Sequence, residues 1–167
     1  ECFRAVRLHL VERSEAARSA QPAALGGHAG RLVSSGAELP DRVRGAILAN
    51  ELLDALPTHV VVMTRHGLRE VFVDASGDRL VEVLLPPSTD DIEACLSGAN
   101  VTLRAGSRAE VNLQALDWIR RAARCLERGF LLIVDYGHEA ARLYSAPSGT
   151  LMPFRGHAAA AAGGGSG

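Results

Sequence analysis

The chain has 167 residues, the length of one globular domain, and 47% of them are hydrophobic, so it can bury a core. Its formal net charge of −1 excludes the strong basic field that draws proteins to nucleic acid or to anionic membranes. No apolar run approaches the roughly 20 residues that a membrane-spanning helix needs. The composition therefore predicts a folded domain that neither spans a membrane nor binds nucleic acid.

The start of the chain and its cysteines indicate where the protein works. The chain begins with Glu1 and no signal-peptide pattern follows, so we expect it to start inside a longer protein. Cys2, Cys95 and Cys125 lie far apart and form no CxxC pair, which favours a reducing cytoplasm over a disulfide framework. The chain has 18 arginines and no lysine, which indicates GC-rich coding DNA and a bacterial source.

The first part of the chain predicts a strand followed by a helix. Residues 6–12 alternate and then become apolar, as in a strand that enters a core. Ser14 is placed to cap a helix over residues 15–25, which Pro22 should bend or shorten. A glycine-rich loop at residues 26–30 and a short strand follow.

The middle of the chain predicts a buried strand and then an antiparallel meander. The strand at residues 45–49 runs directly into the segment 50–57, which ends on a proline. After that proline, three period-2 runs are separated by turns that contain glycine, which is typical of a meander. The runs cover residues 59–64, 68–74 and 79–85, and a short helix near residues 89–96 follows.

The last part predicts a long amphipathic helix and a fully buried strand. Residues 108–128 carry an apolar stripe with charged side chains beside it, and Gly129 is placed as the helix stop. Residues 130–135 begin with an unbroken apolar run, which is typical of a parallel strand covered on both faces. A last strand is expected at residues 150–155, before a low-complexity tail at 158–167.

Strands joined by helices predict an α/β fold, and the meander indicates an antiparallel insertion into its sheet. The main sheet would be parallel, because helices connect its strands. We therefore expect residues 1–57 to form part of the core, 58–97 to form the inserted meander with its short helix, 98–157 to return to the core, and 158–167 to be the tail.

Three of the apolar strands end on polar side chains: Glu12, Asn50 with Glu51, and Asp135 with Tyr136. In an open α/β sheet, ligands bind in the crevice beyond the carboxyl ends of the strands. We therefore expect these residues to lie along one edge of the sheet and to share a site. The alternative is that they are polar residues that merely begin loops.

Glu12 is the candidate for nucleotide recognition. A carboxylate at the end of a strand can accept hydrogen bonds from both hydroxyls of an adenosine ribose. It is equally compatible with a solvated acid that precedes the Ser14 cap. The acid by itself does not separate S-adenosylmethionine from NAD, because both carry this ribose.

Glu51 and Asp54 are the candidates for chemistry. Their spacing of three places both carboxylates on one side of a helical turn. The alternative is an ordinary helix start, in which Asn50 caps and the acids favour the positive end of the helix dipole. Glu110 is a further candidate, although its expected place in the first turn of the long helix has the same dipole explanation.

Other kinds of site lack their sequence signatures. The six histidines show no metal-ligand spacing and no HExxH pattern, so no metal is expected. GxSxG and Walker patterns are missing from the sequence. The glycine-rich segment at residues 26–30 follows a helix instead of a strand, which makes it a poor phosphate cradle.

Five segments together resemble the MidA-like methyltransferase family, which includes a mitochondrial complex I assembly methyltransferase. NELLDALP followed by a strand that ends in DYG is the most specific part of the resemblance. The segments occur in family order over residues 6–157, and they are LVERSEAARSAQ (10–21), GAILANELLDALPTHVV (45–61), AGSRAEVNLQALDWI (105–119), GFLLIVDYG (129–137) and SGTLMPFRGH (148–157).

The resemblance implies a class I, Rossmann-like methyltransferase sheet with an inserted subdomain, and S-adenosylmethionine as the cofactor. It implies cofactor binding by Glu12 and Asn50, and it places Asn50, Glu51 and Asp54 at the transferred methyl group as catalytic residues. A carboxylate pair suits an arginine substrate, because it can hold a guanidinium through two parallel hydrogen bonds.

The remaining implications concern the substrate and its location. The substrate side would include Glu110, Asp135 and Tyr136. The mitochondrial member dimethylates a protein arginine in a complex I subunit, so we expect a protein-arginine substrate, linked to respiratory complex assembly. The location would be the bacterial cytoplasm, or the mitochondrial matrix in a eukaryote.

The chain departs from the family pattern in two places. The glycine-rich loop that precedes the Glu12 strand is missing from this sequence, and only Ala, Gly and Ser follow His157. We therefore expect a methyltransferase truncated at both ends that binds S-adenosylmethionine weakly or not at all. Two alternatives remain: a truncated, non-catalytic binding module, and an NAD-dependent oxidoreductase that rests on Glu12 alone.

Overall fold

The computed structural model describes residues 5–151, 154–155 and 158–159, and they form two compact units. The first unit comprises Glu1–Ala49 and Trp118–Ile133, and the second comprises Asn50–Asp117 and Val134–Gly167. The domain boundaries expected at residues 57 and 97 stay a prediction. The mixture of helices, parallel strands and an antiparallel sheet confirms the predicted α/β class.

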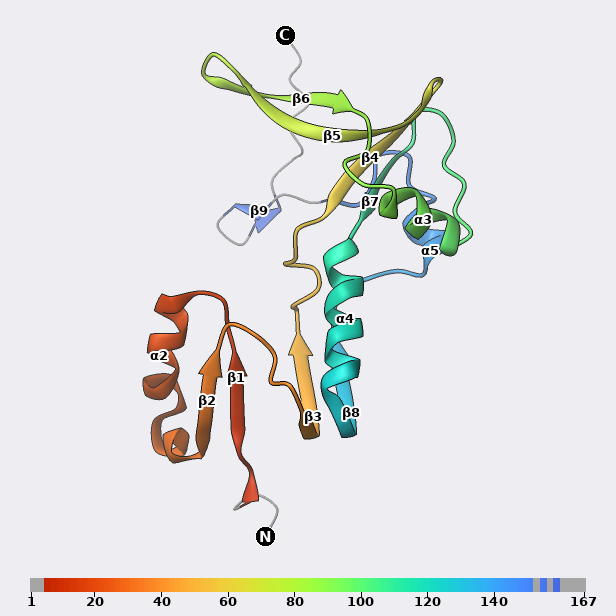
Figure 1. The fold of residues 1–167 in the computed structure, drawn as a ribbon. Coiled ribbons are helices and arrows are strands. Elements are labelled where there is room, and N and C mark those ends of the chain that lie inside the picture. The colour runs from red at the N-terminus through yellow and green to blue at the C-terminus, as the bar shows by residue number, and fades with distance from the viewer. Residues whose placement is uncertain (1–4, 152–153, 156–157, 160–167) are drawn as a thin grey trace. The chain divides into compact units, whose positions relative to one another are not determined.

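A β-α-β arrangement opens the first unit. Strands β1 (Leu8–Val11) and β2 (Leu32–Gly36) pair in parallel, and helix α2 (Glu15–Leu25) connects them (Figure 1). The Ser14 side chain accepts a hydrogen bond from the N–H of Ala17 at 3.3 Å, which confirms the predicted cap. The loop expected at residues 26–30 is instead a 3₁₀ helix, η1 (Gly26–Arg31), because the chain continues to coil after α2 ends.

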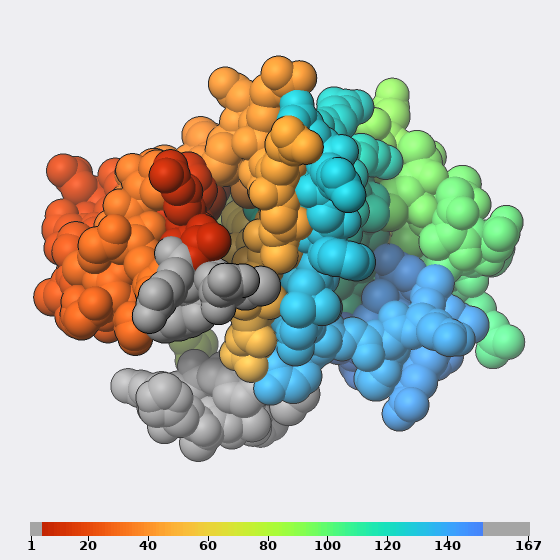
Figure 2. Space-filling view, turned by 90° about the horizontal axis from the view of Figure 1, so that it is seen from below, coloured from red at the N-terminus to blue at the C-terminus, as the bar shows by residue number. Residues whose placement is uncertain are grey.

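Two further strands pair in the chain, β3 (Val43–Asn50) and β8 (Leu126–Val134), and Figure 2 shows their segments side by side. The two strands run parallel, because residues near the start of one contact residues near the start of the other, and the same holds near their ends. Near the start, a Cβ on Gly129 would overlap the carbonyl oxygen of Gly45. Near the end, Glu51 N–H donates to the carbonyl of Val134 at 2.8 Å.

The prediction that residues 130–135 are buried on both faces is wrong. Phe130 is 78% exposed and Leu132 is 55% exposed, although Ile47 and Ala49 on the neighbouring strand are buried. The described residues thus cover the two faces of the β3–β8 pair unevenly. An unbroken apolar run in the sequence does not show whether one face of a strand is covered or both.

The long helix predicted at residues 108–128 is three elements. Residues Arg108–Val111 form strand β7, helix α4 spans only Leu113–Cys125, and β8 begins at Leu126. Tertiary pairing explains the difference, because the residues of β7 form antiparallel pairs with β4 that an isolated helix turn would not provide. Gly129, expected to stop the helix, lies inside β8.

The meander predicted after residue 57 is confirmed within the second unit. Strands β4 (His59–Thr64), β5 (Gly67–Ser76) and β6 (Arg79–Leu85) are antiparallel, and β7 completes a sheet of order β6-β5-β4-β7. Helix α3 (Asp91–Gly98) packs on this sheet. Their shared core consists of buried side chains from both elements and from nearby loops: Val61, Leu68, Ile92, Leu96, Leu103, Ala109 and Val111.

The end of the described chain contains only short elements. Helix α5 spans Ala140–Leu143, and strands β9 (Phe154–Arg155) and β10 (Ala158–Ala159) form an antiparallel pair. Of the strand expected at 150–155, residues 154 and 155 are a strand and residues 150 and 151 are not, while residues 152 and 153 lie outside the described residues. His157 and most of the expected tail lie outside the described residues.

Candidate functional site

The acids of the NELLDALP segment lie on a bend and a turn, not on the helical turn that their spacing suggested. Glu51 takes a φ of +47°, a conformation that non-glycine residues rarely adopt, and it breaks the line of β3. Residues 51–56, here called the acidic turn, are closed by a hydrogen bond from Leu56 N–H to the Leu53 carbonyl at 3.3 Å. Both Glu51 and Asp54 are exposed to solvent.

The acidic turn is held at Leu53 by two side chains distant in sequence. Leu53 N–H donates to Asp135 Oδ2 at 2.7 Å, and Asn112 Nδ2 donates to the Leu53 carbonyl oxygen at 2.9 Å. Both hydrogen bonds are partly buried. The two polar groups of Leu53 are therefore fixed by residues that follow β8 and β7, which restricts the path of the chain between Glu51 and Asp54.

Asp135 and Tyr136 lie next to the acidic turn, as the sequence predicted, but their contacts differ. The second oxygen of Asp135, Oδ1, accepts the N–H of Tyr136 at 2.8 Å, so both carboxylate oxygens bind backbone. The Tyr136 side chain is 77% exposed, and its hydroxyl donates a long hydrogen bond of 3.4 Å to Glu51 Oε1. An accessible carboxylate beside an accessible aromatic ring is a combination that suits a cationic group.

Asn112 is the residue of this arrangement that the sequence interpretation missed. It lies between β7 and α4, and its Oδ1 accepts the N–H of Ala115 at 2.8 Å, which makes it the N-cap of α4. The available sequence signal was an Asn directly before an amphipathic helix. It was hidden because the helix was expected to begin at residue 108.

Two other predicted site residues have different surroundings. Asn50 is exposed at the end of β3. Glu110 lies in β7 and not in the first turn of α4, since residues 108–111 pair with β4. Its carboxylate accepts hydrogen bonds from Thr150 N–H at 2.9 Å, Thr150 Oγ1 at 3.1 Å and Leu151 N–H at 3.4 Å, so it anchors that segment.

Glu12 follows β1 in the first unit. Its Oε1 accepts the N–H of Ser14 at 2.7 Å, and its carbonyl oxygen accepts a hydrogen bond from Arg18 at 2.7 Å. Within the described residues, Oε2 has no hydrogen-bond donor, so this oxygen is available to a ligand hydroxyl. A common sheet edge for Glu12, Asn50 and Asp135 stays a prediction.

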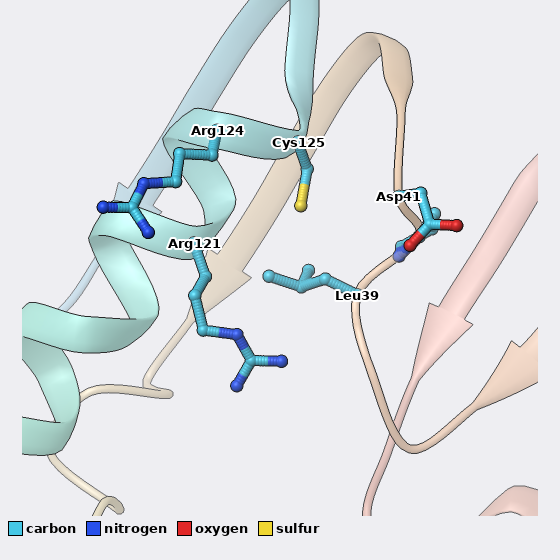
Figure 3. A pocket seen from close by; sticks show the side chains of 6 residues that line it. Leu39, Asp41, Arg121, Arg124 and Cys125 are labelled. Atoms are coloured by element: carbon cyan, nitrogen blue, oxygen red, sulfur yellow. The ribbon is translucent and has the colours of Figure 1, made fainter.

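A separate hollow of about 250 Å³ lies in the first unit (Figure 3). Its lining combines Arg121, Arg124 and Cys125 of α4 with a loop at residues 39–41, and Arg121 also forms an ion pair with Glu38. None of the site residues predicted from the sequence lines it.

The described part of the chain contains neither a clustered set of metal ligands nor a helix that could span a membrane. There, no group of three His, Cys, Asp or Glu side chains is arranged to hold a metal ion. Among the same residues, no helix combines the length and the apolar character needed to cross a bilayer.

Solved structures similar to this chain come from Burkholderia thailandensis. One is an uncharacterized superfamily protein with a TM-score of 0.81 and 28% identity, over 92% of this chain and 42% of that protein. The second, of the same superfamily, was crystallised with S-adenosyl-homocysteine and has a TM-score of 0.75 and 28% identity, over 87% of this chain and 39% of that protein. Both likenesses confirm the Rossmann-like methyltransferase fold.

Sequence comparison gives the same result. The mitochondrial protein arginine methyltransferase NDUFAF7 of Rattus norvegicus is 36% identical over an alignment of 107 residues, which covers 57% of this chain. The chain spans 22% of the length of that relative. A family model described as "Putative S-adenosyl-L-methionine-dependent methyltransferase" matches residues 1–162. Because the match covers nearly the whole sequence, the chain belongs to this family of S-adenosyl-L-methionine-dependent methyltransferases.

Proposed function

We propose that the protein containing this chain transfers a methyl group from S-adenosylmethionine to an arginine side chain of another protein. The chain spans 22% of the arginine methyltransferase and 42% of the first Burkholderia structure, so the activity concerns the whole protein. The observation that carries the proposal is the acidic turn. It presents the carboxylates of Glu51 and Asp54 to solvent beside the exposed ring of Tyr136.

The contacts of Glu12 support a role for this residue at the ribose end of the cofactor. Glu12 retains one carboxylate oxygen for a hydroxyl, while Ser14 N–H orients the other at 2.7 Å. A carboxylate oriented in this way is preorganised to accept a ribose hydrogen bond without first losing another protein contact. When bound, the cofactor supplies a methyl group carried on a sulfonium.

The acids of the turn would act on the acceptor. A guanidinium is planar and cationic, so a carboxylate can hold it through two parallel hydrogen bonds and fix the direction of its nitrogen lone pair. Methylation of a guanidinium nitrogen releases a proton, which a carboxylate oxygen of Glu51 or Asp54 can accept. Because methyl transfer is an in-line displacement, this positioning is the main contribution expected from the protein.

The acceptor and location are proposed more specifically from the family. The mitochondrial arginine methyltransferase at 36% identity supports a protein arginine as the acceptor class. We infer a respiratory-complex subunit as the acceptor, in the cytoplasm of a bacterium or in the matrix of a mitochondrion. Methylation of such a subunit in a strain that lacks the gene would contradict this assignment.

The test uses the full-length protein and distinguishes Glu51 and Asp54, which would bind the methyl acceptor, from Glu12, which would bind the cofactor. We expect Glu51→Gln and Asp54→Asn each to slow methyl transfer roughly thirty- to a thousandfold, because a charged hydrogen bond contributes about 2–4 kcal/mol. Their cofactor affinity should stay near wild type. Glu12→Gln should show the reverse, with weaker cofactor binding first.

Transfer is measured with tritiated S-adenosylmethionine and protein extract from the gene-deleted host, and methylarginines are identified after hydrolysis. Binding is measured by titration with S-adenosyl-homocysteine, with NAD as a competitor. Glu93→Gln is the matched control, because Glu93 is an exposed acid on α3. Normal transfer by both turn variants would reduce NELLDALP to a structural turn, and displacement by NAD would favour an oxidoreductase.

A further inference from the structure

We infer that Asn112 and Asp135 are positioning residues, which hold the acidic turn in the conformation that presents Glu51 and Asp54 to the acceptor. This inference rests on the proposed function for the identity of the acceptor only. The geometric part concerns residues of the second unit alone, since residues 50–117 and 134–167 belong to that unit.

The first reason is that the turn has an unfavourable conformation that must be held from outside. Glu51 has a φ of +47°, a left-handed backbone conformation that is strained for a non-glycine residue. Within the turn, the closing hydrogen bond from Leu56 to Leu53 is long, at 3.3 Å. The two short hydrogen bonds at Leu53, 2.7 Å from Asp135 and 2.9 Å from Asn112, are the stronger constraints.

The second reason is that each positioning side chain has its other polar atom occupied. Asn112 uses Oδ1 to cap α4 through Ala115 N–H, so its amide is oriented and Nδ2 must point to the Leu53 carbonyl. Asp135 uses Oδ1 on Tyr136 N–H, which fixes its carboxylate plane. The turn is therefore tied to a helix start and to a strand end, two rigid elements.

The roles of Asn112 can be separated by choice of substitution. Asn112→Asp keeps an oxygen that caps α4, because Asp and Asn cap helices about equally well. It replaces the donor Nδ2 with an oxygen that repels the Leu53 carbonyl. Asn112→Ala removes both interactions. A difference between these variants in stability, together with a similar effect on the turn, identifies positioning as distinct from capping.

The experiment compares the full-length wild type, Asn112→Asp, Asn112→Ala and Asp135→Asn. For Asn112→Asp we expect an unfolding midpoint lowered less than in Asn112→Ala, faster amide hydrogen exchange in peptides that cover residues 51–56, and a turnover number about ten- to a hundredfold lower. The affinity for S-adenosyl-homocysteine should not change. Asp135→Asn should also raise exchange, because one of its two backbone donors, Leu53 or Tyr136, would then face an NH₂ group.

Two results would overturn the inference. The first is wild-type exchange at residues 51–56 in Asn112→Asp. The second is a loss of stability in Asn112→Asp as large as that in Asn112→Ala, since the effect would then be structural. A wild type that methylates a nitrogen other than arginine would reject the proposed acceptor. In that case, the inference still requires Asn112→Asp to slow methyl transfer to the nitrogen that is methylated. If the wild type methylates nothing, amide hydrogen exchange at residues 51–56 alone tests the positioning role.

Discussion

The two units bury their apolar side chains to different degrees. In the second unit, the sheet β6-β5-β4-β7 and helix α3 share a core in which Val61, Ile92 and Val111 are fully buried. In the first unit, the strands with the most apolar sequences leave Leu48 67% exposed and Phe130 78% exposed. The second unit thus has the larger buried core among the described residues, although β6 adds no buried side chain to it.

The difference shows that hydrophobic sequence and burial are separate properties. A period-2 strand needs only one covered face, and the core shared with α3 provides it for β4, β7 and the start of β5, whereas β6 has no buried residue. An unbroken apolar strand needs cover on both faces. The proposed roles follow the same division, because the acidic turn belongs to the second unit and Glu12 to the first.

The largest expected effect tests whether the meander core determines stability. Ile92 is 0% exposed within the core, so Ile92→Ala should reduce the free energy of unfolding by about 2–5 kcal/mol. Phe130→Ala removes a larger side chain that is 78% exposed, and it should change stability by less than about 1 kcal/mol. Urea unfolding measures both variants, and an equal loss from both would abolish the contrast between the units.

A smaller effect is expected where Glu110 anchors the chain after Gly149. Gly149 has a φ of +76°, and a Cβ there would overlap Glu110 Oε1, so Gly149→Ala should destabilise by about 1–3 kcal/mol. Gly98→Ala is the matched control, because a Cβ at Gly98 meets nothing within 4 Å. Thermal unfolding that shows no difference between the two variants would mean that the anchor is not needed for the fold.

Glu70 gives the second unit an expected dependence on pH. Burial acts to raise the pKa of Glu70, but hydrogen bonds from His59 at 2.7 Å and Ser88 at 2.6 Å outweigh it, and the pKa lies below its ordinary value. A lowered pKa in the folded state stabilises above the unfolded pKa, and this contribution is lost as pH falls through the folded pKa.

Glu70→Gln should therefore destabilise the chain at neutral pH by about 1–2 kcal/mol and flatten the decline of stability on acidification below about pH 4.5. Unfolding by urea at a series of pH values checks this expectation. The exposed Glu93→Gln serves as the control. A variant that declines as steeply as the wild type would show that Glu70 is not responsible.

The smallest effect is expected at an exposed ion pair on the same sheet. Arg108 donates two hydrogen bonds of 2.8 Å to Glu82, and these lower the pKa of Glu82 below its ordinary value. The Glu82 side chain is 56% exposed, so Glu82→Gln should cost at most about 0.5–1 kcal/mol. Unfolding at low and high salt should show this difference shrink with added salt, and a cost that is independent of salt would argue against an ionic contribution.

Local chemistry allowed much of the second unit to be predicted. The meander strands are separated by turns in which Gly67 and Gly77 have positive φ values of +104° and +61°, conformations that glycine adopts without strain. Valine is frequent in the strands beside these turns, and β-branched residues favour strands. Such elements depend on neighbours within a few residues, and for that reason their positions agree with the structure.

The candidate site was predictable only in part. The strand-end pattern correctly placed Asp135 and Tyr136 near Glu51, as Tyr136 contacts it and Asp135 holds the adjacent Leu53. The conformation of the turn and the role of Asn112 could not be predicted. The hydrogen bonds that decide them join residues 82 and 59 positions apart.

The sequence by itself determined the family, the α/β class and the meander, because these depend on local periodicity, on turn residues and on motif order, whereas the roles of the acids stay a prediction. Only the tertiary structure decided that Arg108–Val111 is a strand, that the acidic turn is not helical, and that Asp135 binds backbone. The physical reason is that a buried peptide group must find a partner, and that partner can come from any part of the folded chain.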